Sequence, residues 1–570
     1  MRILEEYLEF RNAKCKDCYK CLRECPVKAI KVVDHQAKII KERCILCGKC
    51  TRVCPQNAKR VHSSKDEVLN LIRTNKKVVA SVAPSFISSF RIQDFSIMKI
   101  ALCKLGFFDA EETSIGANVV VQEYEKLLKS GKYKNFITSA CPAINRMIQI
   151  YYPNALEYLA PVDTPAVVHA KMIKEADSEA KVVFIGPCIA KKKEGKDSGV
   201  IDGVLTFEEL FELFNDNNID LNMISNVHVS EDKEVANRAK YFPISRGIIK
   251  SFASLPKGYE YIAIDGVERC FEVLNSINDL SGIFLEINSC ASACINGPCS
   301  LTKEKDSISS NAIVRSYARK EMELGGKSDK VPYDLEVSTE YNRIRTGDIP
   351  GTDKQIEAIL AKTGKLKPED ELNCGVCGYS TCRAKAWAVL NGYADIDMCL
   401  PYMRKKAESM SYEIIQNSPN GIIVVDSDLK IVDINAKALE LGGMTGYDVK
   451  GKYVVDYFEP TDFVFALNDE KNIIRKKMYI PKTKSYVELS ITYLKEHKTM
   501  FAIMKDITSG VNYNDKLSKV KQETFKTTDE VINKQMRVVQ EIASLLGETT
   551  AESKVALLKL KKTLQEEEEE

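Results

Sequence analysis

The sequence predicts a multidomain chain that combines α/β and α+β folds, and three observations lead to this prediction. Eight cysteines are grouped near the N-terminus, which indicates a small domain built around metal. Apolar β-branched runs alternate with helical stretches from about residue 77 to 320, as in an α/β domain with buried parallel strands. The part after Cys399 contains no cysteine, and its pattern predicts a compact domain followed by helices.

The size and composition of the chain fit this organisation. Its 570 residues suggest three to five domains at about 150 residues each. The net charge is +2, from 82 basic and 80 acidic residues, so we expect neither nucleic acid nor a membrane surface as a partner. No apolar run approaches the roughly 20 residues of a membrane span, and residues 1–10 lack the apolar stretch of a signal peptide. We therefore expect a cytoplasmic location.

Cysteine is the most informative residue type, with 19 cysteines against five histidines. Thiols stay reduced in the cytosol, so clustered cysteines there indicate metal sites. The scarcity of histidine favours iron–sulfur centres held by thiolates over mixed cysteine and histidine zinc sites.

The N-terminal cysteines form two identical runs. Each has the spacing C-x2-C-x2-C-x3-C and is followed by a proline, Pro26 or Pro55. The repeat resembles two-cluster ferredoxins, in which the fourth cysteine of each run ligates the other cluster. The resemblance implies a domain over residues 1–62 with two [4Fe–4S] sites: Cys15, Cys18, Cys21 and Cys54 in one, and Cys44, Cys47, Cys50 and Cys25 in the other. Two zinc knuckles are the alternative.

Residues 78–82, 136–138 and 182–185 are the clearest candidate strands of the central domain, and the distinctive motifs follow them. Open α/β sheets bind ligands at the carboxyl ends of their strands. Four segments in this region, residues 81–85, 138–142, 186–194 and 286–294, together resemble the H-cluster domain of [FeFe]-hydrogenases. The resemblance implies an α/β H-cluster domain over residues 63–325.

The same resemblance implies a ligand set. Cys141, Cys188, Cys290 and Cys294 would hold a [4Fe–4S] cubane, and Cys294 would also bridge to a two-iron subcluster with CO, cyanide and a bridging dithiolate. Lys191 matches the residue that donates to one cyanide, and Ser85 faces the other. A lysine ammonium is a strong donor to such an anion. Four structural cysteines in an α/β core are the alternative, and we prefer that interpretation for Cys103 and Cys270.

Several positions depart from the pattern of fast hydrogenases. Ala140 replaces the cysteine that relays protons there, and a methyl group carries no proton. Of the relay carboxylates, Glu123 is retained and the second position is Lys126, while Ala160 stands at a relay serine. Three further changes surround the subcluster: Gly186 and Asn288 replace methionines, and Ala293 replaces a glycine. We therefore expect slow turnover.

A further cysteine motif follows a linker over residues 326–351. Cys374, Cys377, Cys382 and Cys399 have the spacing C-x2-C-x4-C-x16-C, with a helix in the long gap. This motif is similar to a small [4Fe–4S] domain of anaerobic electron-transfer proteins, which implies such a domain over residues 352–404. A zinc site is the alternative.

Residues 405–510 resemble a PAS domain. Two strands, 421–426 and 429–435, precede a helix that begins at Ala436, and strands at 485–491 and 499–507 close the domain. Residues 511–570 are predicted to be helical, with an acidic tail. Ile532, Met536, Val539, Ala543 and Leu546 form a stripe near heptad spacing, Gly547 ends the helix, and Thr549 with Glu552 begins a second one. The alternatives are a helical hairpin or coiled coil, or packing onto the PAS domain.

Together the motifs predict a sensory [FeFe]-hydrogenase of low turnover, in which iron–sulfur clusters relay redox state to a PAS output domain. The alternatives are an ordinary ferredoxin-linked hydrogenase and a non-catalytic iron–sulfur scaffold. The expected partners are H2, a redox protein such as ferredoxin, a signalling protein that docks on the PAS or helical region, and a second copy in a homodimer.

Overall fold

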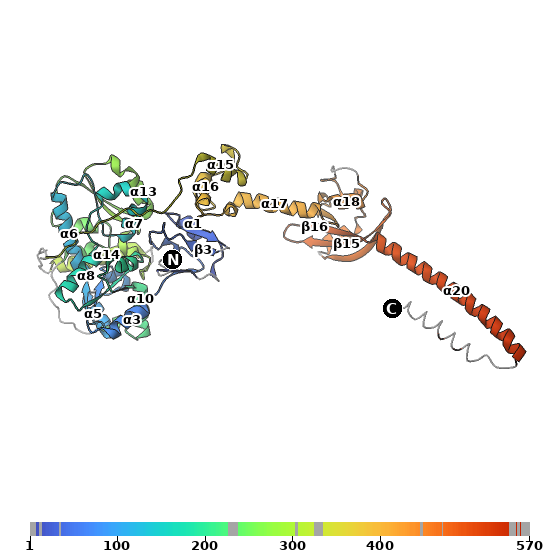
Figure 1. The fold of residues 1–570 in the computed structure, drawn as a ribbon, viewed down its shortest axis with the longest axis horizontal. Coiled ribbons are helices and arrows are strands. Elements are labelled where there is room, and N and C mark those ends of the chain that lie inside the picture. Colours follow the sequence, from blue (N-terminus) through green and yellow to red (C-terminus); the bar gives the residue numbers. More distant parts are fainter. Residues whose placement is uncertain are drawn as a thin grey trace. The chain divides into compact units, whose positions relative to one another are not determined.

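A computed structural model describes residues 7–10, 14–33, 36–225, 237–302, 306–323, 334–444, 449–469 and 471–546, together with Val555 and Lys559. The chain forms two compact units, Met1–Met403 and Arg404–Glu570 (Figure 1). Both contain helices and sheets, so the predicted mixed fold class is confirmed.

The N-terminal domain consists of two short antiparallel strand pairs and two short helices. Strand β1 (Leu8–Phe10) pairs with β4 (Lys59–Val61), and β2 (Ile30–Val33) pairs with β3 (Gln36–Ile39). Helices α1 (Lys20–Glu24) and α2 (Lys49–Arg52) each lie within one cysteine run. The two halves of the sequence repeat therefore form similar local structures.

The central domain contains two parallel sheets. One has the order β6 (Asp109–Glu112), β5 (Val78–Val82), β8 (Lys181–Gly186) and β9 (Gly203–Thr206). The other has the order β10 (Glu260–Asp265), β11 (Ile283–Asn288) and β7 (Phe136–Ile137). Strands β5 and β11 are buried along their whole length. For β5 this confirms the buried strand that its apolar run predicts.

Helices cover these sheets in the first unit. They are α3 (Lys65–Thr74), α4 (Phe86–Phe90), α5 (Phe95–Leu105), α6 (Ser114–Lys129), α7 (Pro142–Tyr151), α8 (Pro165–Ala176), α9 (Ala190–Ser198), α10 (Phe207–Asp216), α11 (Leu221–Ser225), α12 (Gly247–Ser251), α13 (Val267–Ser276) and α14 (Ser307–Glu323). Of the two cysteines assigned to the core, Cys270 is fully buried on α13, but the expectation for Cys103 is wrong, because it is exposed on α5.

An extended segment leads from the central domain to the small cysteine-rich domain. Its backbone is tied to the central domain by hydrogen bonds from Thr339 N to Pro161 O and from Ile344 N to Gln149 O. The small domain contains α15 (Asp353–Lys362) and α16 (Cys382–Leu390), so the predicted helix in the long cysteine gap is confirmed. Helix α17 (Leu400–Gln416) follows.

The second unit contains a five-stranded antiparallel sheet. Its order is β13 (Ile431–Ile434), β12 (Gly421–Asp426), β16 (Thr499–Asp506), β15 (Ser485–Leu494) and β14 (Ile473–Ile480), with α18 (Ala436–Leu441) and α19 (Thr461–Asn468) beside it. Asn435 begins α18: its Oδ1 accepts from Ala438 N, and its Nδ2 donates to Ile415 O and Asn420 O. The strand β14 was not predicted, because it is mostly exposed and three adjacent charged residues, 475–477, interrupt the alternation of apolar and polar residues.

Helix α20 (Thr508–Leu546) continues from this sheet as one long helix (Figure 1, orange to red). Within the predicted stripe, Ile532, Met536 and Val539 are half-buried. The predicted stop at Gly547 and the capping pair Thr549 and Glu552 lie outside the described residues. Among the helices that the structure describes, none is long and apolar enough to cross a membrane.

Candidate iron–sulfur sites

The first N-terminal site gathers Cys15, Cys18, Cys21 and Cys54 around one cavity. Thus the last cysteine of the second run joins the first three of the first run, as the ferredoxin resemblance implies. The ammonium of Lys59, which is 4% exposed, donates to Cys21 Sγ at 2.9 Å. A cation at this position would balance the negative charge of a bound cluster.

The second N-terminal site brings Cys25 together with Cys44, Cys47 and Cys50. Burial raises the pKa of Cys44 to about 11, and the proximity of Cys25 adds to this. Backbone N–H groups already point at the sulfurs: Ala29 N donates to Cys25 Sγ at 3.2 Å, and Leu46 N lies 3.4 Å from Cys44 Sγ. Thiols in such a buried group stay protonated at neutral pH unless bound iron stabilises the thiolates.

The hydrogenase-type site lies at the carboxyl ends of three parallel strands. Cys141 precedes α7, Cys188 follows β8, and Cys290 and Cys294 follow β11. Burial raises the pKa of all four thiols, and their mutual proximity raises the pKa of Cys188, Cys290 and Cys294 further. The chain just after the 286–294 segment approaches the 186–194 segment closely, since a Cβ on Gly297 would lie 2.6 Å from Pro187 O.

Ser85 and Lys191 both lie in the interior of this domain. Ser85 is fully buried, and its Oγ has no hydrogen-bond partner among the residues that the structure describes. The Lys191 Nζ donates to Thr164 Oγ1 at 2.8 Å and to Glu194 Oε2 at 2.5 Å. A buried hydroxyl without a partner is costly, and a ligand acceptor would satisfy it. The unpartnered Ser85 hydroxyl therefore fits a group with buried anionic ligands, such as the cyanides of the two-iron subcluster.

The replacement of a methionine by Gly186 leads us to expect a gap in the pocket, and this expectation is wrong. A Cβ on Gly186 would lie 2.8 Å from the ring of Phe184 and 3.2 Å from Ala83 Cβ. Asn288 is buried, and its Nδ2 donates to Asp265 Oδ1 at 3.1 Å. Of the two positions where the chain lacks the methionine of fast hydrogenases, Gly186 thus lies against an aromatic ring, and Asn288 provides a hydrogen-bonded amide.

The positions that correspond to the proton relay of fast hydrogenases differ in chemistry and in burial. Ala140 is half-buried and apolar, and Ala160 is fully buried. The Nζ of Lys126 donates to the Glu123 carboxylate at 3.0 Å, so the two positions that match the relay carboxylates form an ion pair. Neither alanine side chain can carry a proton.

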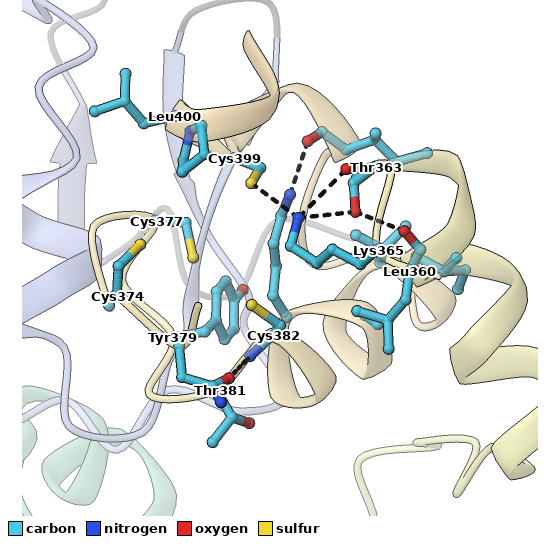
Figure 2. A pocket seen from close by; sticks show the side chains of 18 residues that line it. Leu360, Thr363, Lys365, Cys374, Cys377, Tyr379, Thr381, Cys382, Cys399 and Leu400 are labelled. Carbon is cyan, nitrogen blue, oxygen red and sulfur yellow. Dashed lines mark hydrogen bonds between the residues drawn. The ribbon is translucent and has the colours of Figure 1, made fainter. Parts of the chain in front are cut away.

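The fourth site is a cavity lined by Cys374, Cys377, Cys382 and Cys399, and Figure 2 shows their side chains around it. Gly375 and Gly378 have φ values of +70° and +92°, which allow the tight turns of this loop. Three contacts support the site: Lys365 Nζ lies 3.5 Å from Cys399 Sγ, Asn373 Oδ1 accepts from Cys382 N, and Thr381 caps α16. The cysteine set and the nearby cation suit an anionic cluster.

In the part of the chain that the structure describes, no three Cys, His, Asp or Glu side chains are close enough together to hold a single metal ion. The cysteine groups nevertheless surround cavities at the first and fourth sites.

Family models match four segments of the chain. They are the C-terminal domain of the iron-only hydrogenase large subunit over residues 76–298, a 4Fe–4S dicluster domain over 14–66, an Fe–S cluster domain over 370–401 and the PAS fold over 410–497. The four resemblances predicted from the sequence are thereby confirmed.

Two curated relatives are hydrogenases. The periplasmic [Fe] hydrogenase large subunit of Nitratidesulfovibrio vulgaris is 31% identical over 311 residues, which cover 49% of this chain and 73% of the relative. Iron hydrogenase 1 of Clostridium pasteurianum is 23% identical over 299 residues, which cover 41% of this chain and 52% of that protein. This chain therefore spans about half the length of the second relative.

Two solved structures resemble parts of this chain. A variant of the [FeFe]-hydrogenase HydA1 from Chlamydomonas reinhardtii is 15% identical and matches 49% of this chain and 99% of its own, with a TM-score of 0.36. The PAS domain of an HTR-like protein from Haloarcula marismortui is 21% identical and matches 18% of this chain and 99% of its own, with a TM-score of 0.15.

A hydrogenase-type α/β domain with iron–sulfur sites on both sides of it in the sequence defines an iron–sulfur oxidoreductase with an attached PAS domain. The chain belongs to the [FeFe]-hydrogenase family.

Proposed function

We propose that this protein is a sensory [FeFe]-hydrogenase, which interacts slowly with H2 and relays the resulting redox state to its PAS domain. The main observation in support is the hydrogenase-type site itself. It combines the neighbouring thiols of four cysteines, the buried hydroxyl of Ser85 and the buried ammonium of Lys191. Cys141, Cys188, Cys290 and Cys294 would hold the H-cluster, which when bound supplies the chemistry of splitting H2 into protons and electrons.

The residues around the site support slow turnover. Ala140 carries no titratable proton, and Glu123 is paired with Lys126 outside the buried core. A device that reports H2 tolerates slow proton delivery, whereas an enzyme of high flux does not. The PAS domain and α20 give the second unit a place for an output partner, and the half-buried stripe on α20 suits a second copy of the chain.

Infrared spectroscopy of the protein matured with the two-iron subcluster tests the proposal. Bands from CO and cyanide that shift reversibly under H2 are expected. Their absence, with the cubane clusters loaded, would favour a non-catalytic scaffold. Bands together with rapid H2 evolution from a reduced mediator would favour an ordinary ferredoxin-linked hydrogenase.

A second experiment tests the relay. Cys382→Ser removes a thiolate from the fourth site and leaves the H-cluster ligands in place. The variant should keep the infrared response to H2 but lose any H2-dependent change in partner binding by the second unit. An unchanged partner response would remove the fourth site from the relay.

A further inference from the structure

The small cysteine-rich domain is fixed to the rest of the first unit around one arginine. Arg43 Nη1 lies 2.5 Å from Asp348 Oδ2, and Tyr393 Oη donates to the other carboxylate oxygen at 2.6 Å. The guanidinium carbon lies 5.2–5.4 Å from the ring centroids of Tyr151, Trp387 and Tyr393. The Arg43 side chain is 11% exposed, so its charge is paired and stacked away from water.

The cysteine loops of two sites touch directly beside this arginine. Gly378 follows Cys377, and a Cβ on it would lie 3.0 Å from Leu22 Cγ and 3.4 Å from Arg23 N. Leu22 is fully buried, and the adjacent Tyr379 is 5% exposed in the same apolar cluster. The turn of the fourth site therefore packs against α1, which leads to Cys25.

Lys28 lies near cysteines of both sites. Its ammonium donates to Arg23 O at 2.9 Å and interacts electrostatically with both Cys25 and Cys377. Tyr379 also interacts with both of these thiols and with Arg43. Since Cys25 belongs to the Cys25/Cys44/Cys47/Cys50 site, the fourth site lies next to that site.

The Cys25/Cys44/Cys47/Cys50 site also adjoins the hydrogenase-type site. Cys290 interacts electrostatically with Cys47. The loop that follows Cys47 also packs tightly against the hydrogenase-type domain. A Cβ on Gly48 would lie 2.4 Å from Pro298 Cβ and 2.7 Å from Ile189 Cδ1. On another side, Lys59 interacts with Cys50 as well as with Cys21 and Cys54 of the first site.

We propose that the Cys25/Cys44/Cys47/Cys50 site is a three-way junction, which adjoins the first site, the hydrogenase-type site and the fourth site, and that Arg43 is the positioning residue that holds the fourth site against it. The inference deepens the proposed function, because it assigns the route between H2 chemistry and the small domain to this junction. The fourth site exchanges electrons with the hydrogenase-type site through the junction and not directly.

Pulsed electron paramagnetic resonance on the full chain, loaded with its clusters and reduced with dithionite, tests the junction. The signal of the fourth-site cluster is the one that is lost in Cys382→Ser, and the spin relaxation of this signal is measured. A nearby paramagnetic cluster speeds relaxation. Cys47→Ala disrupts the junction cluster, so it should slow the relaxation of the fourth-site cluster severalfold. The matched variant Cys18→Ala, in the first site, should leave it unchanged. Equal effects of the two variants, no effect of either, or slowing in Cys18→Ala alone would overturn the proposal.

Arg43→Gln tests the positioning role without altering a ligand. In Arg43→Gln the spin relaxation of the fourth-site cluster should slow as it does in Cys47→Ala, while the iron content stays that of the wild type. The control Arg73→Gln, at an exposed position, should behave as the wild type. An unchanged rate in Arg43→Gln contradicts the role of Arg43. The infrared bands under H2 test the proposed function separately. If these bands shift under H2 but relaxation is unchanged in all these variants, the junction is refuted and the proposed function stands.

Discussion

The ammonium of Lys192 lies 2.7 Å from Oε1 of Glu209, in an ion pair that joins α9 to α10 in the interior of the first unit. The two side chains are 3% and 9% exposed. Lys192 also donates to His62 O and Ser64 Oγ, and Glu209 accepts from Ser64 N and Thr206 N. The pair therefore ties the segment after the N-terminal cysteine domain to the hydrogenase-type domain.

Lys192→Met should destabilise the first unit by about 3–5 kcal/mol, because it leaves the Glu209 carboxylate buried without its cation. Chemical denaturation of the full chain, followed by the loss of helical circular dichroism, measures the change. Lys193→Met is the matched control: Lys193 pairs with Asp197, which is 57% exposed, so its loss should cost less than about 1 kcal/mol. Equal effects at the two positions would contradict the structural role of the buried pair.

Lys191→Met tests the neighbouring lysine for a different role. The change keeps all four cysteines of the hydrogenase-type site but removes the donor that contacts Thr164 and Glu194. We expect protein that binds its cubane yet retains little of the two-iron subcluster, because the anionic ligands lose a charged donor. Infrared band intensity per cubane measures retention, with exposed Lys196→Met as the control. Full retention in Lys191→Met would show that this ammonium does not serve the subcluster.

Much of the fold followed from local patterns. The strands β5, β8 and β12 and the helix α16 lie where apolar runs and cysteine spacing predict them. The grouping of Cys54 with the first three cysteines also followed from the repeat, through its resemblance to two-cluster ferredoxins. These features depend on residues close in sequence or on a spacing fixed by the cluster, so a single sequence contains them.

Contacts between distant segments could not be predicted in this way. The bond between Asn288 and Asp265 and the stacking of Arg43 on Trp387 follow no sequence period. Each depends on which helices and loops the tertiary fold brings together. The exposure of Cys103 was mispredicted for the same reason, since an apolar helix such as α5 does not show in sequence which of its faces meets solvent.

The cation at the fourth site gives a prediction about reduction potential. Lys365 Nζ lies 3.5 Å from Cys399 Sγ, where its charge favours the more negative, reduced state of a bound cluster (Figure 2). Lys365→Gln should therefore lower the midpoint potential of this cluster. For a one-electron couple, a tenfold loss in the equilibrium constant for reduction corresponds to a decrease of about 59 mV. A redox titration followed by electron paramagnetic resonance measures it. Exposed Lys367→Gln should leave the potential unchanged, and an increase in Lys365→Gln would contradict the electrostatic argument.

Glu286 is a buried acid whose protonation should influence stability. Its carboxyl is fully buried on β11, and burial raises the pKa of Glu286 to about 8, although the N–H of Ile249 donates to it at 2.9 Å. Below its ordinary value near 4.5 the group is protonated in both the folded and the unfolded chain. Between that value and about 8 the unfolded chain loses the proton while the folded chain keeps it, so stability falls as pH rises.

Glu286→Gln removes this titration and keeps a similar shape, so it should flatten the pH dependence of unfolding. At pH 5 the variant should match the wild type closely, and at pH 8.5 it should be more stable by on the order of a few kcal/mol. Scanning calorimetry of the full chain at both pH values measures the shift in the unfolding temperature of the first unit. Glu260→Gln, at an exposed position on β10, is the control and should not change the pH dependence. A variant that follows the wild type at both pH values would mean that Glu286 is ionised in the folded protein, with a compensating cation or water at its carboxylate.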